Sequence, residues 1–198
     1  MYEKVKRIID FIISLVCMPI VGIIILFSGI AIKIEDRGPI FYMADRTGRY
    51  GRPFKMYKLR SMKVNAPDIR LKDGSSYNSE DDPRVTKFGK FARKTSIDEI
   101  PQLINVLKGE MALIGPRPDS TFYLDQYTEE ERKILKVRPG ITGYNQAVNR
   151  NIVGTKEKLR NDIYYVEHMS FLFDIKIIFL TIKTVCSHKN IYRVSEKK

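Results

Sequence analysis

The sequence predicts an α+β fold with a membrane anchor at its N-terminus, and three observations support this prediction. A stretch without charged residues runs from Phe11 to Ile32, close to the roughly 20 apolar residues that span a bilayer. Two short segments of alternating apolar and polar residues flank a turn between Pro39 and Arg60, which is typical of a β-hairpin. Several later segments place apolar residues at helical spacing. We therefore expect an anchor at residues 1–33 and a small, mainly helical domain at residues 34–198.

The composition narrows the function classes without choosing one. The formal net charge is +12 at pH 7, so the chain suits nucleic acid, an anionic membrane surface or phosphorylated substrates. The two cysteines, Cys17 and Cys186, have neither paired nor metal-type spacing. They predict no disulfide framework or zinc site and favour a reducing, cytoplasm-facing protein. The sequence contains no Gly-x-Gly-x-x-Gly or P-loop motif for nucleotide binding.

The apolar segment allows two membrane topologies. A signal peptide would need a small-residue cleavage site, whereas charged residues follow this segment. Pro19 lies at its centre and is expected to kink a helix. Basic residues flank the segment on both sides, so they do not indicate which end faces the cytoplasm. A spanning helix and a hairpin that returns to the same side both fit. Asp10 lies inside the apolar pattern, with Lys6 or Arg7 as its expected partner.

The predicted hairpin has strands at Pro39–Tyr42 and Phe54–Arg60 and a turn at Gly48–Pro53. It carries a dense positive charge. Its basic residues are Arg46, Arg49, Arg52, Lys55, Lys58 and Arg60. They fit either a solvated face or a patch that meets a membrane surface or phosphate groups.

Three further helices are expected beyond a polar loop at residues 65–83. Residues Arg84–Lys94 have a basic amphipathic pattern, which fits a helix in the membrane interface or one packed on the core. Residues Tyr127–Val137 predict a charged helix. Residues Tyr164–Thr184 predict one long amphipathic helix on the core or on the membrane, because charged residues interrupt its apolar run.

The stretch Arg93–Pro118 contains an adjacent pair of carboxylates, Asp98 and Glu99, at the predicted start of a helix. Either Ser96 and Glu99 form a capping box, or Asp98 is the N-cap, since Pro101 is tolerated only in a first turn. Both alternatives place Asp98 where the helix dipole favours an ionised carboxylate and nearby phosphate. Adjacent residues do not share a helix face, so the two carboxylates could divide two roles. On spacing alone, a purely structural cap is the commoner explanation.

Motifs around this pair and in the hairpin resemble the bacterial sugar transferase family, the monotopic phosphoglycosyl transferases. The matching stretches are Tyr57–Met62, Ser96–Leu103, Asn105–Met111, Gly115–Pro118 and Arg138–Gly143. The resemblance runs from the N-terminal apolar segment to about Leu180, nearly the whole chain. Long motifs in the same order make it specific.

The resemblance implies a re-entrant anchor at residues 1–33, a helix–break–helix that dips into one leaflet with its break at Pro19. Interfacial helices and a cytoplasmic catalytic domain at residues 34–198 complete the implied architecture, attached monotopically to the bacterial inner membrane. The family usually has Ser-Pro at the break, whereas this chain has Met18 before Pro19. Ser14, one helical turn earlier, is the expected substitute for the missing hydroxyl.

The resemblance also implies transfer of a sugar 1-phosphate from a UDP-sugar to undecaprenyl phosphate, with Mg²⁺ as cofactor. Asp98 would be the nucleophile and a Mg²⁺ ligand, forming a covalent intermediate that splits one displacement into two. Glu99 would assist by handling the acceptor's proton. Arginine suits the phosphate contacts because its planar fork binds phosphate bidentately. The residues implied in binding phosphate or nucleotide are Lys58, Arg93, Arg117 and Arg150, with Asp162 as support.

Further partners implied by the resemblance are an anionic lipid bilayer and downstream glycosyltransferases, with a homodimer as a candidate assembly. Val148 and Asn149 stand where the family usually has Asn-Gly, which bears on the sugar accepted. Two other function classes stay open. A nucleic-acid-binding module fits the charge, but the apolar anchor and the lack of a recognised motif weaken it, so no nucleic acid is expected. A membrane scaffold without catalysis would use the carboxylate pair only as a helix cap.

Overall fold

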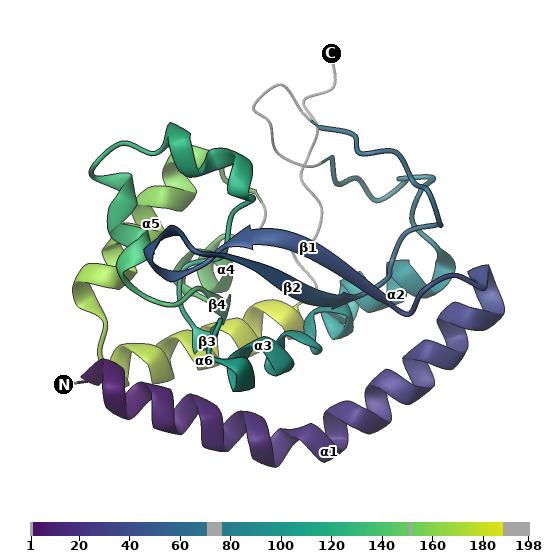
Figure 1. Cartoon of the computed structure of the whole chain (residues 1–198), viewed down its shortest axis with the longest axis horizontal. Helices are drawn as coiled ribbons and strands as arrows, with labels where there is room; N and C mark the ends of the chain where they lie inside the picture. The colour runs from purple at the N-terminus through teal and green to yellow at the C-terminus, as the bar shows by residue number, and fades with distance from the viewer. Residues whose placement is uncertain (1, 71–76, 151, 188–198) are drawn as a thin grey trace.

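The longest element is the N-terminal helix α1 (Tyr2–Asp36), which curves along one side of the molecule (Figure 1). The structure is a computed structural model that describes residues 2–70, 77–150 and 152–187. At roughly 1.5 Å per residue, the 35 residues of α1 extend for about 52 Å. Within the described ranges, α1 is the one helix that is long and apolar enough to cross a membrane. The predicted apolar segment lies inside it.

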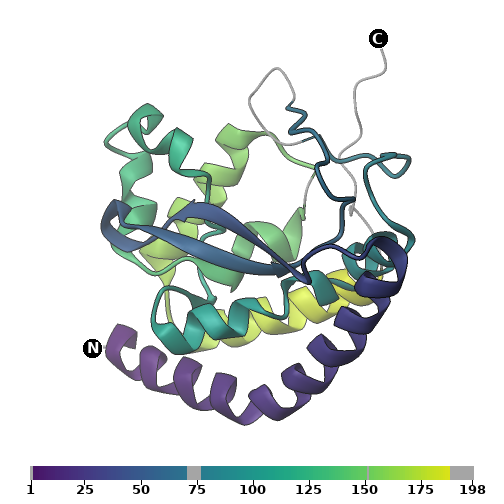
Figure 2. The ribbon, with the colours of Figure 1, turned by 45° about the vertical axis from the view of Figure 1, so that its right-hand side comes forward.

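The helix does not stop at Pro19, so the expected helix–break–helix is not present as an interruption. Pro19 lies inside α1, and the helix bends near its middle in both views (Figure 1, Figure 2). A proline removes one backbone hydrogen bond and crowds the preceding turn, which bends a helix without ending it. The buried hydroxyl of Ser14 has no hydrogen-bond partner among the described residues, so Ser14 does not take the role expected of it.

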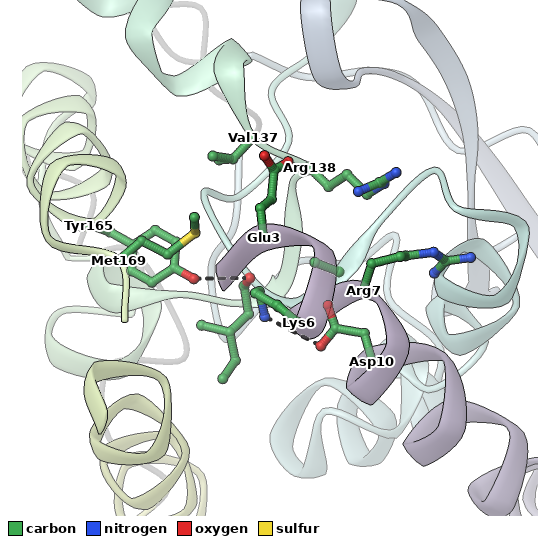
Figure 3. Close-up of a pocket in the computed structure, with 10 residues that line it drawn as sticks. Glu3, Lys6, Arg7, Asp10, Val137, Arg138, Tyr165 and Met169 are labelled. Carbon is green, nitrogen blue, oxygen red and sulfur yellow. Dashed lines mark hydrogen bonds and ion pairs between the residues drawn. The ribbon is translucent and has the colours of Figure 1, made fainter. Parts of the chain in front are cut away.

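The first turns of α1 are attached to helix α6 (Phe171–Cys186) through the buried carboxylate of Asp174. Lys6 Nζ lies 3.0 Å from Asp174 Oδ2, and the hydroxyl of Tyr2 donates to the same oxygen at 2.6 Å. Lys6 also pairs with Asp10 at 3.3 Å, as predicted (Figure 3). Buried carboxylates are costly unless they are paired, so these contacts hold the start of α1 against the body.

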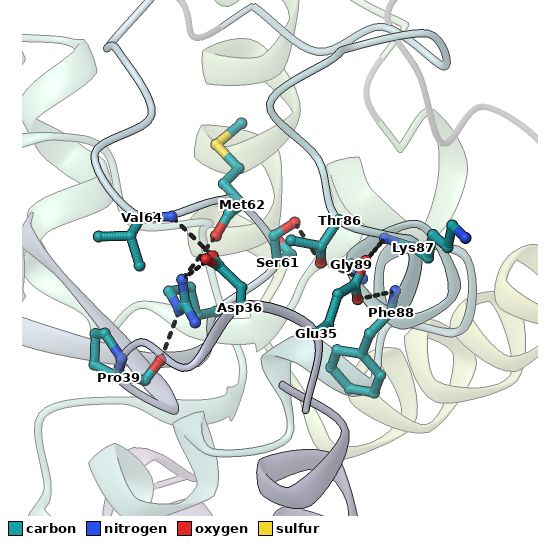
Figure 4. Close-up of polar contacts among 11 residues, drawn as sticks. Glu35, Asp36, Pro39, Ser61, Met62, Val64, Thr86, Lys87, Phe88 and Gly89 are labelled. Carbon is teal, nitrogen blue, oxygen red and sulfur yellow. Dashed lines mark hydrogen bonds and ion pairs between the residues drawn. The ribbon is translucent and has the colours of Figure 1, made fainter. Parts of the chain in front are cut away.

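The last turn of α1 is attached to two other parts of the body (Figure 4). The carboxylate of Glu35 accepts hydrogen bonds at 2.6 and 2.9 Å from the first two backbone N–H groups of α2 (Lys87–Thr95). Asp36 pairs with Arg60 and accepts the N–H of Val64 at 2.9 Å. Both ends of α1 are therefore bound to the same body. The exposed apolar residues between those ends include Phe11, Ile12, Leu15, Val16, Ile20, Ile23, Leu26, Phe27 and Ile30.

The predicted hairpin is present at the centre of the domain, but its first strand runs from Phe41 to Thr47 and not from Pro39 to Tyr42 as predicted. Strands β1 (Phe41–Thr47) and β2 (Pro53–Leu59) pair antiparallel, and the 3-10 turn η1 (Arg49–Gly51) lies between them. One face of the hairpin packs on α3 (Gln102–Lys108). Fully burying a valine, phenylalanine or methionine side chain stabilises a fold by about 1.5–3 kcal/mol. The apolar cluster at this contact consists of Ala44, Phe54, Met56, Val106 and Met111.

A second, parallel pair of short strands is not predicted by the sequence. It joins β3 (Ala112–Ile114) to β4 (Gly140–Thr142). The two backbones approach so closely that a Cβ added to Gly140 would lie 2.1 Å from the backbone nitrogen of Gly115. The glycines of two quoted motifs therefore allow backbone packing. This packing positions the segment that carries Arg117.

The expected long helix at Tyr164–Thr184 is two helices, α5 (Thr155–His168) and α6, so this prediction was wrong. Ser170 lies between them in extended conformation, and its hydroxyl accepts the third N–H of α6 at 3.3 Å. A serine in this position ends one helix and caps the next. Tyr165 from α5 and Ile177 from α6 are fully buried in one cluster.

The charged helix predicted at Tyr127–Val137 is present only as the shorter 3-10 helix η4 (Glu131–Lys136). Ile134 within η4 is buried, and so is Val137, which follows the helix in extended conformation. The other short helices are η2 (Ile97–Glu99), η3 (Thr121–Gln126) and α4 (Tyr144–Val148).

Candidate active site

Asp98 and Glu99 lie in the 3-10 turn η2, between α2 and α3. Ser96 ends α2 in the left-handed conformation (φ 60°, ψ 18°), and its side chain makes no capping bond to η2. Helix α3 begins only at Gln102, with Pro101 before it. Neither predicted helix start is therefore correct: the capping box does not form, and Asp98 is not the N-cap of α3. In this turn, burial and neighbouring charges determine the pKa of Asp98, whereas a helix dipole was expected to do so.

The buried amide of Asn105 attaches α3 to the hairpin and so positions the turn. Its Oδ1 accepts the N–H of Tyr57 at 3.0 Å, and its Nδ2 donates to the carbonyl of Lys55 at 2.8 Å. Because Lys58 follows Tyr57 on β2, this amide brings Lys58 next to η2. Asn105 was not among the residues predicted for the site, although a polar residue between apolar helix positions was an available signal.

The carboxylate of Glu99 is held by two cations. Lys58 Nζ donates to Oε1 at 2.7 Å, and Arg117 donates to Oε1 at 2.7 Å and to Oε2 at 3.3 Å. Burial alone would raise the pKa of Glu99, but the charges of Arg117 and Lys58 and their hydrogen bonds outweigh it. The pKa of Glu99 is therefore held well below its usual range. Glu99 is a fixed anion that keeps Lys58 and Arg117 in place.

At the neighbouring carboxylate of Asp98, burial has a larger effect on the pKa than the cations have. Within the part of the chain that the structure describes, it accepts no hydrogen bond and forms no ion pair, and Asp98 is 8% exposed. Burial raises the pKa of Asp98 to about 6, and the charge of Glu99 adds to this. Lys58, Arg93 and Arg117 lower it, but not enough to cancel burial. The sequence predicted that a helix terminus would favour the ionised form of Asp98, whereas in the structure burial opposes that form and the nearby cations favour it.

The other predicted cations lie around the same turn. Arg93 acts on the pKa of Asp98, and its Nε donates to the hydroxyl of Ser61 at 3.0 Å. Arg150 donates to the hydroxyl of Ser96 at 3.2 Å. The structure thus gathers the predicted residues Lys58, Arg93, Asp98, Glu99, Arg117 and Arg150.

Asp162 and Pro19 lie outside this group. Asp162 is fully buried, and Lys158 Nζ lies 3.7 Å from its Oδ2, which is too far for a hydrogen bond. Burial raises the pKa of Asp162 to about 7. Lys158 donates to the backbone carbonyl of Arg117 at 3.3 Å, so Lys158 lies between Asp162 and that residue. Pro19 belongs to α1.

The residues present fit a Mg²⁺ ion only if the substrate completes its coordination. Among residues 2–70, 77–150 and 152–187, no group of three or more His, Cys, Asp or Glu side chains could hold a metal ion. Mg²⁺ commonly uses one or two carboxylates, with water and substrate phosphate as its other ligands. Asp98 has uncommitted oxygens, whereas those of Glu99 are taken up by Lys58 and Arg117. Asp98 is therefore the ligand that this site offers.

Comparisons with known proteins connect this chain to one family. A family model described as bacterial sugar transferase matches residues 1–188 of the chain. The galactosyl transferase CpsE of Streptococcus agalactiae is 43% identical over 189 residues, which cover 91% of this chain and 42% of that protein. The uncharacterized sugar transferase EpsL of Bacillus subtilis is 38% identical over 190 residues, which cover 96% of this chain and 91% of that protein.

A third relative is named after both of its substrates. The UDP-N-acetylgalactosamine-undecaprenyl-phosphate N-acetylgalactosaminephosphotransferase of Aeromonas hydrophila is 37% identical over 190 residues. The match covers 93% of this chain and 44% of that protein. The chain thus spans less than half the length of two of these relatives and nearly all of the Bacillus subtilis protein.

Proposed function

The chain belongs to the bacterial sugar transferase family, and from this membership and the geometry of the site we propose that it is a phosphoglycosyl transferase. It moves a sugar 1-phosphate from a UDP-sugar to undecaprenyl phosphate and releases UMP. The Aeromonas hydrophila relative is named for substrates of these two classes. One relative is named for galactose and another for N-acetylgalactosamine, so the proposal leaves the sugar open. The product would supply downstream glycosyltransferases, which makes this the first membrane step of glycoconjugate assembly.

The observation that carries the proposal is the contrast between the two adjacent carboxylates. Glu99 is occupied by Lys58 and Arg117, whereas Asp98 is uncommitted within the described chain and still reaches the surface. A positioned carboxylate of this kind can act as a nucleophile. With a pKa of about 6, Asp98 is mostly ionised at neutral pH.

In the proposed first step, a carboxylate oxygen of Asp98 attacks the phosphorus that bears the sugar. An oxygen–phosphorus bond forms, the bond from that phosphorus to the bridging oxygen breaks, and its electron pair leaves with UMP. In the second step, an oxygen of undecaprenyl phosphate attacks the same phosphorus, and the electron pair of the broken bond returns to Asp98. A covalent intermediate of this kind predicts ping-pong kinetics.

The cations around η2 would offset the repulsion between two anionic substrates. Arg117 suits this because its fork can hold a carboxylate and phosphate oxygens in one plane. The low pKa of Glu99 makes it a weak base, so we assign it the positioning of Lys58 and Arg117 in preference to proton transfer. Asp98 would also hold Mg²⁺, which when bound would neutralise charge on phosphate oxygens.

We further propose that α1 is a re-entrant anchor in the bacterial inner membrane, with the body on the cytoplasmic side. The attachment of both ends of α1 to one body supports this, because a straight spanning helix would put its ends on opposite faces. The bend near Pro19 and the exposed apolar residues between the ends also support it. A lipid acceptor requires a site close to the membrane, and this arrangement would provide it.

The test of the covalent step is intact-protein mass spectrometry. The enzyme is mixed with Mg²⁺ and each member of a UDP-sugar panel, without lipid. The wild-type chain should release UMP and gain the mass of one phosphosugar. Asp98→Asn has nearly the same shape but is a poor nucleophile, so it should do neither. The exposed Asp125→Asn is the matched control and should behave as wild type.

Two outcomes would contradict this proposal. An adduct that persists in Asp98→Asn, or a strict need for both substrates at once, would favour direct displacement with Asp98 as a metal ligand. No UMP release from any UDP-sugar, with or without undecaprenyl phosphate, would favour a membrane scaffold without catalysis.

A further inference from the structure

Arg46 lies beside the segment that carries Arg117, and the mechanism proposed above does not use it. The backbone of Arg46 on β1 forms an isolated antiparallel bridge with Ser120. The next residue, Thr47, donates its N–H to the carbonyl of Asp119 at 2.9 Å. The hairpin is therefore joined to the chain just beyond Arg117 at this point.

The register of the hairpin shows which way Arg46 points. Arg46 is opposite Phe54, and residues directly opposite each other project from the same face of a sheet. Phe54 belongs to the buried cluster against α3, so Arg46 faces the body of the domain. Lys58 lies four residues beyond Phe54 on β2 and projects from the same face. Arg46 and Lys58 therefore project from the same face of the hairpin toward the body, and they lie near its opposite ends.

Among the residues that the structure describes, the guanidinium of Arg46 has no anionic partner. It is partly buried, and within the described ranges it makes no hydrogen bond or ion pair. The carboxylate whose charge acts on it is Asp119, but both of its oxygens are occupied. Lys158 donates to Oδ1 and Tyr127 to Oδ2, each at 2.6 Å. A partly buried cation without a partner is costly, and proteins usually pair such groups.

A second guanidinium increases this cost. Burial lowers the pKa of Arg46, and the positive charge of Arg117 lowers it further. Arg117 is offset by Glu99, whereas Arg46 has no equivalent partner in the described chain. Two cations held close enough to repel each other are stabilised when an anion binds between them.

We propose that Arg46 binds the nucleoside-side phosphate of the UDP-sugar, while Lys58 and Arg117 face the phosphate that Asp98 attacks. This inference rests on the proposed function. When the bridging bond breaks, the electron pair goes to the oxygen of the departing UMP. A cation at that phosphate therefore stabilises both the bound donor and the leaving group. The lipid acceptor does not contain this phosphate, so Arg46 acts on the donor alone.

The experiment measures UDP and UMP binding by titration calorimetry, using the full chain in nanodiscs without lipid acceptor. Losing a hydrogen-bonded charge contact should weaken the binding of both nucleotides to Arg46→Gln by about ten- to a hundredfold. Arg52→Gln is the matched control, because it removes the same charge from an exposed position on the same hairpin. Its nucleotide affinity should stay within about twofold of wild type.

Thermal unfolding separates a ligand contact from a structural one. Without ligand, Arg46→Gln should have a Tm equal to or above that of wild type, because an unpaired cation has been removed. The rise in Tm that saturating UDP causes in wild type should be largely lost in Arg46→Gln. A lower ligand-free Tm with unchanged nucleotide affinity would overturn the inference and make Arg46 a structural residue.

The outcomes also distinguish this inference from the proposed function. A wild-type chain that releases UMP from a UDP-sugar, together with an Arg46→Gln variant that binds UDP as tightly as wild type, would reject the inference alone. A higher KM for undecaprenyl phosphate with unchanged UDP affinity would reassign Arg46 to the acceptor and overturn it too. A wild-type chain that turns over no UDP-sugar would reject the proposed function itself.

Discussion

Asp98 and Glu99 are adjacent in the chain, yet their pKa values are shifted in opposite directions. Two cations reach Glu99 and lower its pKa, although it is also removed from water. Burial dominates at Asp98, where no cation makes direct contact within the described residues, and raises its pKa. The charge of each carboxylate affects the pKa of the other, so a substitution of one should shift the pKa of the other.

The first prediction at residue scale is a pH profile. The proposed attack needs ionised Asp98, whose pKa is about 6. The rate of adduct formation should therefore be nearly flat above pH 7 and fall by about tenfold per pH unit well below 6. Single-turnover mass spectrometry measures this rate from about pH 4.5 to about pH 8, a range that includes the pKa. A rate independent of pH over this range would contradict the assignment of Asp98.

Glu99→Gln provides a check on that assignment. It removes a negative charge next to Asp98 and frees Lys58 and Arg117 to interact with Asp98. Both changes favour the ionised form, so the midpoint of the profile should move to lower pH. A midpoint that stays in place or rises would show that Glu99 does not influence the nucleophile as the structure indicates.

The second prediction concerns Arg117, which binds Glu99 through both ends of its fork. Arg117→Lys keeps the charge but loses the bidentate geometry. Activity should fall by about tenfold or more. Tm should change little, because Lys58 still pairs with Glu99. The exposed Arg52→Lys is the control, and a fully active Arg117→Lys enzyme would remove Arg117 from the site.

At the scale of elements, α1 is defined by what holds its ends. Its first turns contact α6 through Asp174, and its last turn contacts α2 and the hairpin through Glu35 and Asp36. Val21 and Ile32 are buried between these contacts, but many other apolar residues of this stretch, including Leu26 and Phe27, are exposed in the described chain. Such a long apolar surface is typical of contact with lipid.

The third prediction is that both ends of α1 are accessible from the cytoplasmic face. Single cysteines replace the exposed residues Lys4 and Lys33 in a chain with Cys17→Ser and Cys186→Ser. An impermeant maleimide should label both positions in inverted inner-membrane vesicles and neither in right-side-out vesicles. Labelling from opposite faces would rule out the re-entrant anchor.

The same labelling assay tests the role of Pro19. Pro19→Ala restores the missing backbone hydrogen bond and should straighten α1, so that the cysteine at position 4 becomes accessible from the other face. Gly22→Ala is the control, because a Cβ at Gly22 would meet no atom within 4 Å. It should leave the labelling pattern of the unmodified helix unchanged.

At the scale of the whole molecule, α2 is attached to the last turn of α1 and has an exposed face of its own. Phe91 and the basic residues Lys87, Lys90 and Lys94 are exposed on this helix, whereas Gly89 and Ala92 are buried. This is the arrangement expected of a basic helix at a membrane interface. Glu35 joins α2 to the end of α1 (Figure 4), so both elements would meet the same bilayer surface.

The fourth prediction uses the absence of tryptophan from the chain. Phe91→Trp introduces a single fluorophore on α2, and brominated phospholipids should quench it and shift its emission to shorter wavelength. Phe122→Trp is the matched control on η3, with a similar exposed fraction of 65% against 55% for Phe91, and it should not be quenched. Equal quenching at the two positions would contradict the proposed orientation.

The sequence alone determined those features that depend on local pattern. Alternation of apolar and polar residues predicted the hairpin, and the apolar run ending at Ile32 predicted the helix that could enter a membrane. Adjacent carboxylates within long motifs indicated Asp98 and Glu99 as candidate site residues, although at a helix start and not in the 3-10 turn that they form. Local periodicity could not predict the parallel strands β3 and β4, because their pairing rests on backbone contacts between Gly115 and Gly140.

Only the tertiary structure decided how the site residues are divided among roles. Glu99 pairs with Lys58, which is 41 positions away in the chain, and with Arg117, which is 18 positions away. The sequence spacing of Asp98 and Glu99 therefore does not show which of the two carboxylates is paired with cations. Burial then raises the pKa of the other carboxylate, Asp98. Desolvation and charge pairing depend on distances in space, whereas sequence patterns report only distances along the chain.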